Sequence, residues 1–231
     1  GDWQAPNVAK GTKSFGSMAA MPTEPRVVLI NRPNSPQSFI LGGQRTPVDP
    51  REPTYVDFLT ANNALGGNFL ARLNMNLRES KGWSYGVRGA PQTNENAVGY
   101  VISAPVQADR TGDALAELIR ETGDFLDSNG VTDAELERIV TAQIGELPGQ
   151  FETSGSVLGA MQQNALYGRP DNYYETLAAR YRAQTGESLD AAVRAAIDPD
   201  RFVWVVVGDA SVVRPQLDQL GLDVEVREMG Q

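Results

Sequence analysis

The chain of 231 residues contains no histidine and no cysteine. Without histidine it cannot carry a His-Glu-x-x-His zinc motif, a Ser-His-Asp triad or a Cys-His pair. Without cysteine it forms neither a disulfide nor a thiolate metal site. We therefore expect no catalytic zinc of the usual kind in this chain, and any hydrolytic activity would be shared with residues outside it.

Basic residues and long apolar runs are also scarce. The chain has 20 Lys and Arg against 29 Asp and Glu, a net charge of -9, which argues against a nucleic-acid partner because phosphate backbones need clustered basic residues. No apolar run approaches the roughly twenty residues that a membrane-spanning helix needs. After Leu65-Gly66-Gly67 the Gly-Lys-Ser/Thr ending of a phosphate-binding loop is missing, so nucleotide binding has no support.

Composition divides the chain into two parts. Residues 1–25 open with Gly-Asp-Trp, are rich in Pro, Ala, Gly and Ser, and are predicted to be a linker from a preceding domain. Because the sequence begins at Gly1 rather than Met, we expect a piece of a longer protein. Residues 26–231 are predicted to form the folded domain.

The apolar periodicity of this domain predicts an α+β fold, with a mostly antiparallel sheet and helices packed on one face. The first two strands resemble a hairpin, and Gly42-Gly43 is expected to end the second. Strands are predicted at 27–30, 37–41, 83–90, 97–104, 202–207 and from 224. Helices are predicted at 54–64, 68–81, 109–126, 132–147, 153–167, 173–184, 189–197 and 212–220. The apolar residues expected to face the core from the helix at 153–167 are Val157, Leu158, Met161, Ala165 and Leu166.

The stretch from Leu65 to Val87 organises the rest of the prediction. Leu70, Leu73 and Leu77 recur at helical spacing with Phe69 beside them, so a helix starting near residue 68 would turn one apolar stripe inward. Gly82 is expected to end that helix with a positive φ. The two glycines at 66 and 67 are expected to let two helices approach closely.

The predicted helix and strand place two polar side chains near each other. Arg78 falls in the last turn of the helix, and Tyr85 falls seven residues later on the predicted strand. A guanidinium and a phenol at these positions can converge and donate hydrogen bonds to one carbonyl oxygen. A structural explanation also remains open, because the helix dipole favours an arginine in the last turn and tyrosines commonly pack on strands.

The whole string is more informative than the pair. Leu-Gly-Gly, a helix ending Asn-Leu-Arg-Glu, and Lys-Gly-Trp-Ser-Tyr closely resemble a segment of the M16 (pitrilysin-like, or mitochondrial processing peptidase-like) zinc metallopeptidases. Leu-Tyr-Gly at 166–168, Tyr-Tyr at 173–174 and Val-Val-Val-Gly-Asp at 205–209 follow in the order that the family has. The resemblance covers residues 26–228 and implies a LuxS/MPP-like metallohydrolase fold, as in the C-terminal domain that lacks zinc.

The resemblance also implies a function. M16 enzymes enclose an unfolded peptide between two halves, and the zinc and its histidines lie in another domain. Arg78 and Tyr85 match the family pair that donates to the carbonyl oxygen or the substrate backbone. The resemblance thus implies a domain that completes the substrate chamber of a zinc metalloendopeptidase, with no peptidase activity of its own. The implied partners are the M16 domain or subunit that carries the zinc and a peptide substrate.

Several alternatives stay open at this point. The same string occurs in the second domain of the zinc-bearing half, where it serves packing more than catalysis. Other relatives keep the fold as an inactive scaffold or partner subunit. A free-standing module that binds peptides along a sheet edge is a third option. The Gly-Asp-Trp linker and the Ala, Gly and Asp content resemble those of large secreted bacterial members, which favours the bacterial periplasm.

Overall fold

The computed structural model describes residues 24–95 and 97–229, together with residues 2, 4, 7 and 11. Most of the predicted linker at residues 1–25 lies outside the described residues, so that boundary stays a prediction. Within the described part, no helix combines the length and the hydropathy of a membrane span.

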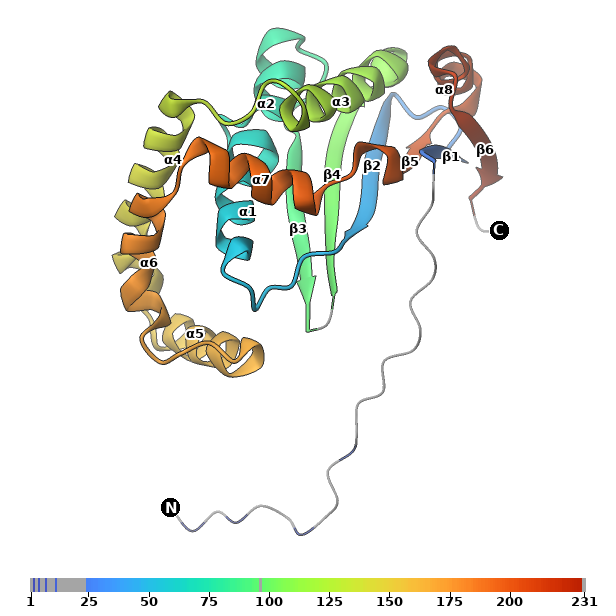
Figure 1. The fold of residues 1–231 in the computed structure, drawn as a ribbon. Helices are drawn as coiled ribbons and strands as arrows, with labels where there is room; N and C mark the ends of the chain where they lie inside the picture. The colour runs from blue at the N-terminus through green and yellow to red at the C-terminus, as the bar shows by residue number, and fades with distance from the viewer. Residues whose placement is uncertain are drawn as a thin grey trace.

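A single six-stranded sheet forms the centre of the fold (Figure 1), in the order β3-β4-β2-β5-β1-β6. Three pairings are antiparallel, β3 with β4, β4 with β2, and β2 with β5, whereas β1 is parallel to both β5 and β6. The predicted α+β class is confirmed, and the sheet is mixed. The strands are β1 (Arg26–Asn31), β2 (Gln37–Thr46), β3 (Arg88–Asn94), β4 (Ala97–Gln107), β5 (Val203–Gly208) and β6 (Asp223–Glu228).

The first two strands do not form the predicted hairpin. Val205 of β5 lies opposite Val28 of β1 on one side and opposite Leu41 of β2 on the other, so β5 separates them. The sequence Val-Trp-Val-Val-Val makes β5 apolar on both faces, which suits a central position. A strand from the far end of the chain therefore replaces the local pairing.

The second strand also runs past the two glycines that were expected to end it. β2 stays paired with β4 as far as Thr46, and Gly42 lies directly against the indole ring of Trp204. A Cβ atom at Gly42 would come within 2.3 Å of a ring carbon, whereas a Cβ at Gly43 would meet nothing within 4 Å. Gly42 thus permits a close contact across the sheet, and no chain reversal is involved.

Helices cover one face of the sheet, and the core lies between the two layers (Figure 1). The inward residues of the strands, such as Ile40, Tyr100 and Trp204, are almost completely buried. On the opposite face of β2, Phe39 and Leu41 are exposed. The α-helices are α1 (Thr54–Asn62), α2 (Arg72–Asn74), α3 (Thr111–Leu126), α4 (Asp133–Glu146), α5 (Ser154–Tyr167), α6 (Tyr173–Ala183), α7 (Gly186–Ala196) and α8 (Ala210–Leu217).

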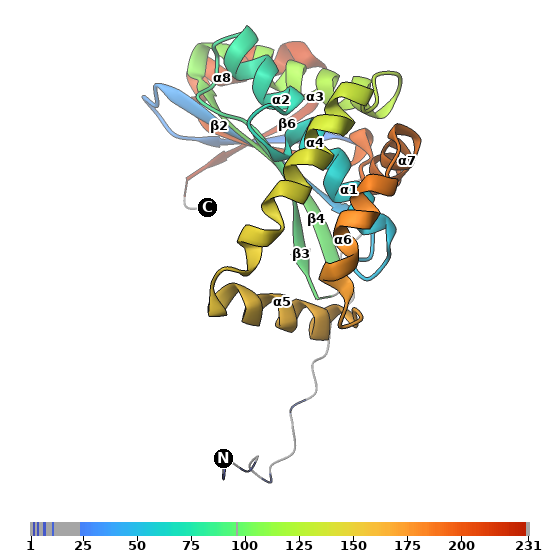
Figure 2. The ribbon, with the colours of Figure 1, turned by 90° about the vertical axis from the view of Figure 1, so that its left-hand side faces the viewer.

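Helices α4 and α6 lead away from the sheet to α5, which lies at the end of the molecule remote from α2 in both views (Figures 1 and 2). The prediction that the apolar stripe of α5 belongs to the core is wrong. Leu158 and Met161 are 56% and 65% exposed, and no residue of α5 is fully buried. The face that α5 turns toward the protein instead carries Ser156, Gly159 and Ala160.

Candidate functional site

The helix that precedes the candidate site begins four residues later than predicted. The side-chain oxygen of Asn68 accepts a hydrogen bond from the N–H of Leu70 at 2.9 Å and holds the chain in a turn. Phe69 and Leu70 therefore lie outside α2 and are 59% and 49% exposed. The prediction that Leu70 shares the buried stripe is wrong, because this turn precedes the helix.

From Arg72 onward the helix follows the predicted pattern. Leu73 and Leu77 are completely buried. After Asn74 the chain continues as a π-helix (Met75–Ser80), in which the N–H of Lys81 donates to the carbonyl of Asn76 at 3.0 Å. The helix ends before Gly82, whose φ of +67° agrees with the prediction. Short π-helical turns are rare in proteins, and those that occur are often found at functional sites.

Tyr85 lies on a bend that precedes the third strand. Strand β3 starts only at Arg88, and before it Ser84 forms an isolated bridge with Val106. The Ser84 hydroxyl donates to the carbonyl of Pro105 at 2.6 Å and fixes this bend to β4. Directly after the bridge, Tyr85 points outward and is 89% exposed. The third strand therefore begins at Arg88, later than the start predicted at residue 83.

The structure brings Arg78 and Tyr85 together. The guanidinium carbon of Arg78 lies 5.7 Å from the centroid of the Tyr85 ring and 4.4 Å from that of Phe69. Its one ion pair with a described residue is to Glu79, at 3.6 Å, and the Arg78 side chain in it is 29% exposed. Ring contacts hold the face of a guanidinium, and its N–H groups point outward in the plane. The pair therefore presents an exposed phenol beside a partly exposed guanidinium.

A buried asparagine holds this arrangement. Asn74 is 4% exposed, donates from Nδ2 to the carbonyl of Phe69 at 2.7 Å, and accepts at Oδ1 from the N–H of Val87 at 2.9 Å. One side chain thus ties the turn that carries Phe69 to the segment that carries Tyr85. Sequence reasoning missed both roles. An asparagine inside a leucine-striped helix was the available signal, because asparagine disfavours helix interiors and hydrogen-bonds nearby backbone.

An ion pair anchors the start of the same helix. Arg72 donates from Nε and Nη2 to the two carboxylate oxygens of Glu135, at 2.8 Å and 2.7 Å, and from Nη2 to the carbonyl of Gly130 at 2.7 Å. Burial alone would raise the pKa of Glu135, but hydrogen bonds from Arg72 and Thr132 outweigh it and lower the pKa to about 2. The pair stays ionised at neutral pH and connects α2 to the start of α4.

Gly66 of the double glycine permits a close approach of backbone, as predicted, but the partner is a strand and not a second helix. A Cβ at Gly66 would lie 2.7 Å from the backbone nitrogen of Gly89, and a Cβ at Gly89 would lie 2.4 Å from the Tyr100 hydroxyl. Gly66 belongs to a π-helix (Asn63–Gly67) and Gly89 to β3, so the close approach joins a helix to a strand. This contact sets the position of the segment that carries the site.

The site offers hydrogen-bond donors and no metal ligands. Within the described part of the chain, no group of three or more His, Cys, Asp or Glu residues is placed to bind a metal ion. The complete sequence also lacks both histidine and cysteine. A zinc centre of the usual kind does not fit these residues.

A protein-family comparison identifies the fold to which this site belongs. The model described as the peptidase M16 inactive domain matches residues 1–143, a range that includes Arg78 and Tyr85. The chain belongs to the peptidase M16 inactive-domain family. The "Uncharacterized zinc protease YmxG" of Bacillus subtilis (strain 168) is 31% identical over 110 residues, which are 48% of this chain and 27% of that protein.

Solved M16 structures show the same fold. The peptidase M16 inactive domain from Pseudomonas fluorescens is 24% identical with a TM-score of 0.75, over 84% of this chain and 45% of that one. The periplasmic protease PqqL from Escherichia coli is 15% identical with a TM-score of 0.67, over 81% of this chain and 21% of that one. The M16 family and fold expected from the sequence are confirmed, and the chain spans less than half of each of these relatives.

Proposed function

We propose that this M16 inactive domain forms part of the substrate chamber of a zinc metalloendopeptidase and supplies Arg78 and Tyr85 to a bound peptide. The observation that carries the proposal is the position of Arg78 beside the exposed rings of Phe69 and Tyr85, whose segments the buried Asn74 ties together. Packing alone does not require a tyrosine that is 89% exposed beside an arginine.

The two side chains would act as donors to the substrate. A phenol donates one hydrogen bond and a guanidinium several, and both suit the carbonyl oxygens of an extended peptide. Donors that are fixed before the substrate arrives stabilise charge on a carbonyl oxygen without reorganisation during the reaction. The contacts of Arg78 with two rings and the anchoring of the flanking segments by Asn74 provide this preorganisation.

The metal would be bound elsewhere, in another M16 domain or subunit that faces this surface. The name of the Bacillus subtilis relative, a zinc protease, supports the proposal, as does the fact that the chain covers 27% of that protein. The unfolded peptide would lie between the two parts. One of the solved relatives is a periplasmic protease, in line with the location that the sequence favours, which stays a prediction.

The test uses the complete protein together with the part that carries the zinc. Tyr85→Phe removes one donor and is expected to lower peptide turnover about a hundredfold, with zinc content and melting temperature unchanged. Arg78→Gln is expected to lower turnover as well. Arg182→Gln is the matched control, because Arg182 is exposed in the last turn of α6, outside the segment that carries Arg78 and Tyr85.

Unchanged turnover of Tyr85→Phe would reject the donor role. A complete protein that binds zinc but cleaves no unfolded peptide would instead indicate the inactive scaffold. Measuring zinc by atomic absorption beside turnover separates these outcomes, because loss of metal would point to misassembly rather than to a missing donor.

A further inference from the structure

A second cavity lies far from the Arg78–Tyr85 surface, where α5 and α6 face α1 and the end of β3 (Figures 1 and 2). Its volume is about 610 Å³, within the roughly 300–1,000 Å³ of ordinary small-ligand sites. Thr93 marks the end of β3 in its wall. Its aromatic lining consists of Tyr55, Phe151, Tyr167, Tyr173, Tyr174 and Tyr181, and we call it the tyrosine cavity.

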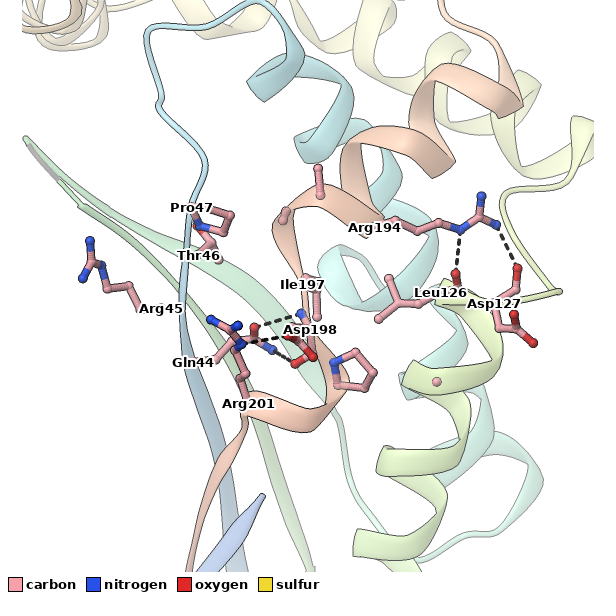
Figure 3. Close-up of a pocket in the computed structure, with 14 residues that line it drawn as sticks. Gln44, Arg45, Thr46, Pro47, Leu126, Asp127, Arg194, Ile197, Asp198 and Arg201 are labelled. Carbon is pink, nitrogen blue, oxygen red and sulfur yellow. Dashed lines mark hydrogen bonds and ion pairs between the residues drawn. The ribbon is translucent and has the colours of Figure 1, made fainter. Parts of the chain in front are cut away.

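Another pocket, of about 690 Å³, lies between β2, α3 and α7 (Figure 3). Unlike the tyrosine cavity, it has polar lining groups that bond to one another or to nearby backbone. Gln44 exchanges two hydrogen bonds of 3.0 Å with the backbone of Asp198, and Arg201 pairs with the Asp198 carboxylate at 2.8 Å. Arg194 donates to the backbone carbonyl of Leu126 at 2.6 Å. Figure 3 shows Arg45 pointing away from these groups. Because these polar groups already have protein partners, we assign no ligand to that pocket.

The tyrosine cavity carries a positive charge without a counter-ion. Among the described residues that line it, Arg169 is the one charged residue, and none is acidic. The chain as a whole has 29 acidic and 20 basic residues, so this lining has the opposite charge from the rest of the protein. The guanidinium carbon lies 4.9 Å from the Tyr167 ring centroid and 4.4 Å from that of Tyr173. Among the described residues, no carboxylate pairs with Arg169, whose Nη2 donates instead to the backbone carbonyl of Pro50 at 3.4 Å.

Two other polar groups of the lining have no hydrogen-bond partner among the described residues. The phenol of Tyr55 is bonded to Thr93 at 2.5 Å, but the hydroxyl of Tyr181 and the side-chain amide of Gln163 form no hydrogen bond with any described residue. Burial raises the pKa of Tyr181, so its hydroxyl stays protonated and can donate. The cavity therefore combines a guanidinium that has no acidic partner, hydrogen-bonding groups and aromatic walls.

We propose that the tyrosine cavity binds the carboxyl end of a peptide. Arg169 would donate two parallel hydrogen bonds to the terminal carboxylate, which the fork of a guanidinium matches in geometry. The tyrosine rings would contact an apolar or aromatic last side chain, and Tyr181 and Gln163 would bond the polar backbone next to it. Ring contacts already hold the guanidinium of Arg169, which lowers the cost of ordering it on binding.

This inference goes beyond the proposed function and does not depend on it. Helix α5, which lines the cavity, and α2, which leads into the segment with Arg78, lie at opposite ends of the molecule (Figures 1 and 2). The readout is binding to this chain alone. A negative result at one site therefore leaves the other untouched.

The test measures fluorescence anisotropy of a labelled hexapeptide ending in phenylalanine, titrated with the full chain, against the same peptide with an amidated carboxyl end. We expect the acid to bind about tenfold or more tightly than the amide, because charge-assisted hydrogen bonds are lost in the amide. Arg169→Gln should reduce the affinity for the acid to that for the amide. Arg182→Gln should leave it unchanged, because Arg182 is exposed in the last turn of α6 and does not line the cavity.

Because Arg169 also contacts two tyrosines, a second variant leaves it in place. A side chain at Gly159 would enter open space in the cavity, with nothing within 4 Å of its Cβ. Gly159→Leu should therefore abolish binding without unfolding the protein, since leucine is the better helix former. Gly145→Leu in α4 adds the same side chain into open space outside the cavity and should leave binding unchanged.

Three results would overturn the proposal. They are equal dissociation constants for the acid and the amide, wild-type affinity in Gly159→Leu, and displacement of the peptide by inorganic phosphate as effectively as by N-acetylphenylalanine. The last result would indicate a general anion site. Displacement of the peptide by N-acetylphenylalanine but not by inorganic phosphate would support recognition of a carboxylate on an aromatic residue.

Discussion

The strongest test of the site's construction is the truncation of Asn74. Asn74→Ala removes a donor to the carbonyl of Phe69 and an acceptor for the N–H of Val87. Val87 is 5% exposed, so its N–H loses its partner in a dry environment, which costs about 1–3 kcal/mol. The turn at Phe69 is exposed and its carbonyl can bond water, so that loss is about 1 kcal/mol. We expect a total destabilisation of about 2–4 kcal/mol.

A second substitution separates the two hydrogen bonds. Asn74→Asp keeps an oxygen that accepts from Val87 but places a negative oxygen against the carbonyl of Phe69. It should therefore destabilise the protein at neutral pH. On acidification the new carboxyl gains a proton and can donate again, so the difference from the wild type should narrow as the pH falls.

The assay is urea unfolding of the full chain followed by tryptophan fluorescence, with hydrogen exchange at the Val87 amide as a local readout. Asn76→Ala is the matched control. Asn76 donates to Glu117 and Glu121 at 2.7 Å and 3.0 Å, and its own oxygen is buried without a partner, so truncation should cost about 1 kcal/mol or less. Equal costs for Asn74→Ala and Asn76→Ala, or unchanged protection of Val87, would refute the positioning role.

Two further predictions concern the sheet and the ion pair. Gly42→Ala should destabilise the fold by about 1–3 kcal/mol, because its Cβ would overlap the Trp204 ring, while Gly43→Ala, which meets nothing within 4 Å, should be stabilising by up to about 1 kcal/mol. Glu135 has a folded pKa of about 2 against an ordinary 4.5, so its pairing with Arg72 stabilises the protein fully above pH 4.5, and this contribution is lost as the pH falls through 2. Glu135→Gln should therefore flatten the acid limb of the stability curve.

Both are measured by denaturant unfolding, the second as a pH series. Equal stabilities of the two alanine variants would show that the contact with Trp204 does not constrain the strand. An acid limb in Glu135→Gln as steep as in the wild type would assign the acid sensitivity to other carboxylates.

Much of the fold followed from local pattern. Leucines at helical spacing predicted the buried residues Leu73 and Leu77, and Gly82 predicted the end of the helix by the conformation that it permits. The helix predicted from residue 132 begins at a capping box that Thr132 forms with Glu135, three residues later. These features depend on neighbours within a few residues, and sequence spacing determines them.

The errors share a different cause. Periodicity shows that α5 has an apolar stripe but does not show what covers it, and Leu158 and Met161 turned out exposed. Pairing of β1 with β2 was inferred from their adjacency, whereas β5, about 160 residues later in the sequence, lies between them. Long-range pairing depends on the whole set of apolar strands.

The sequence by itself determined the absence of imidazole and thiol ligands, the α+β class, and the M16 string that singled out Arg78 and Tyr85. Only the tertiary structure decided that Phe69 joins this pair, that Asn74 holds it, and that Arg169 lies among tyrosines without an acidic partner. The reason is physical. Composition and spacing limit which groups a chain can offer, but contacts between distant segments decide which of those groups meet, which are buried, and which remain without a partner.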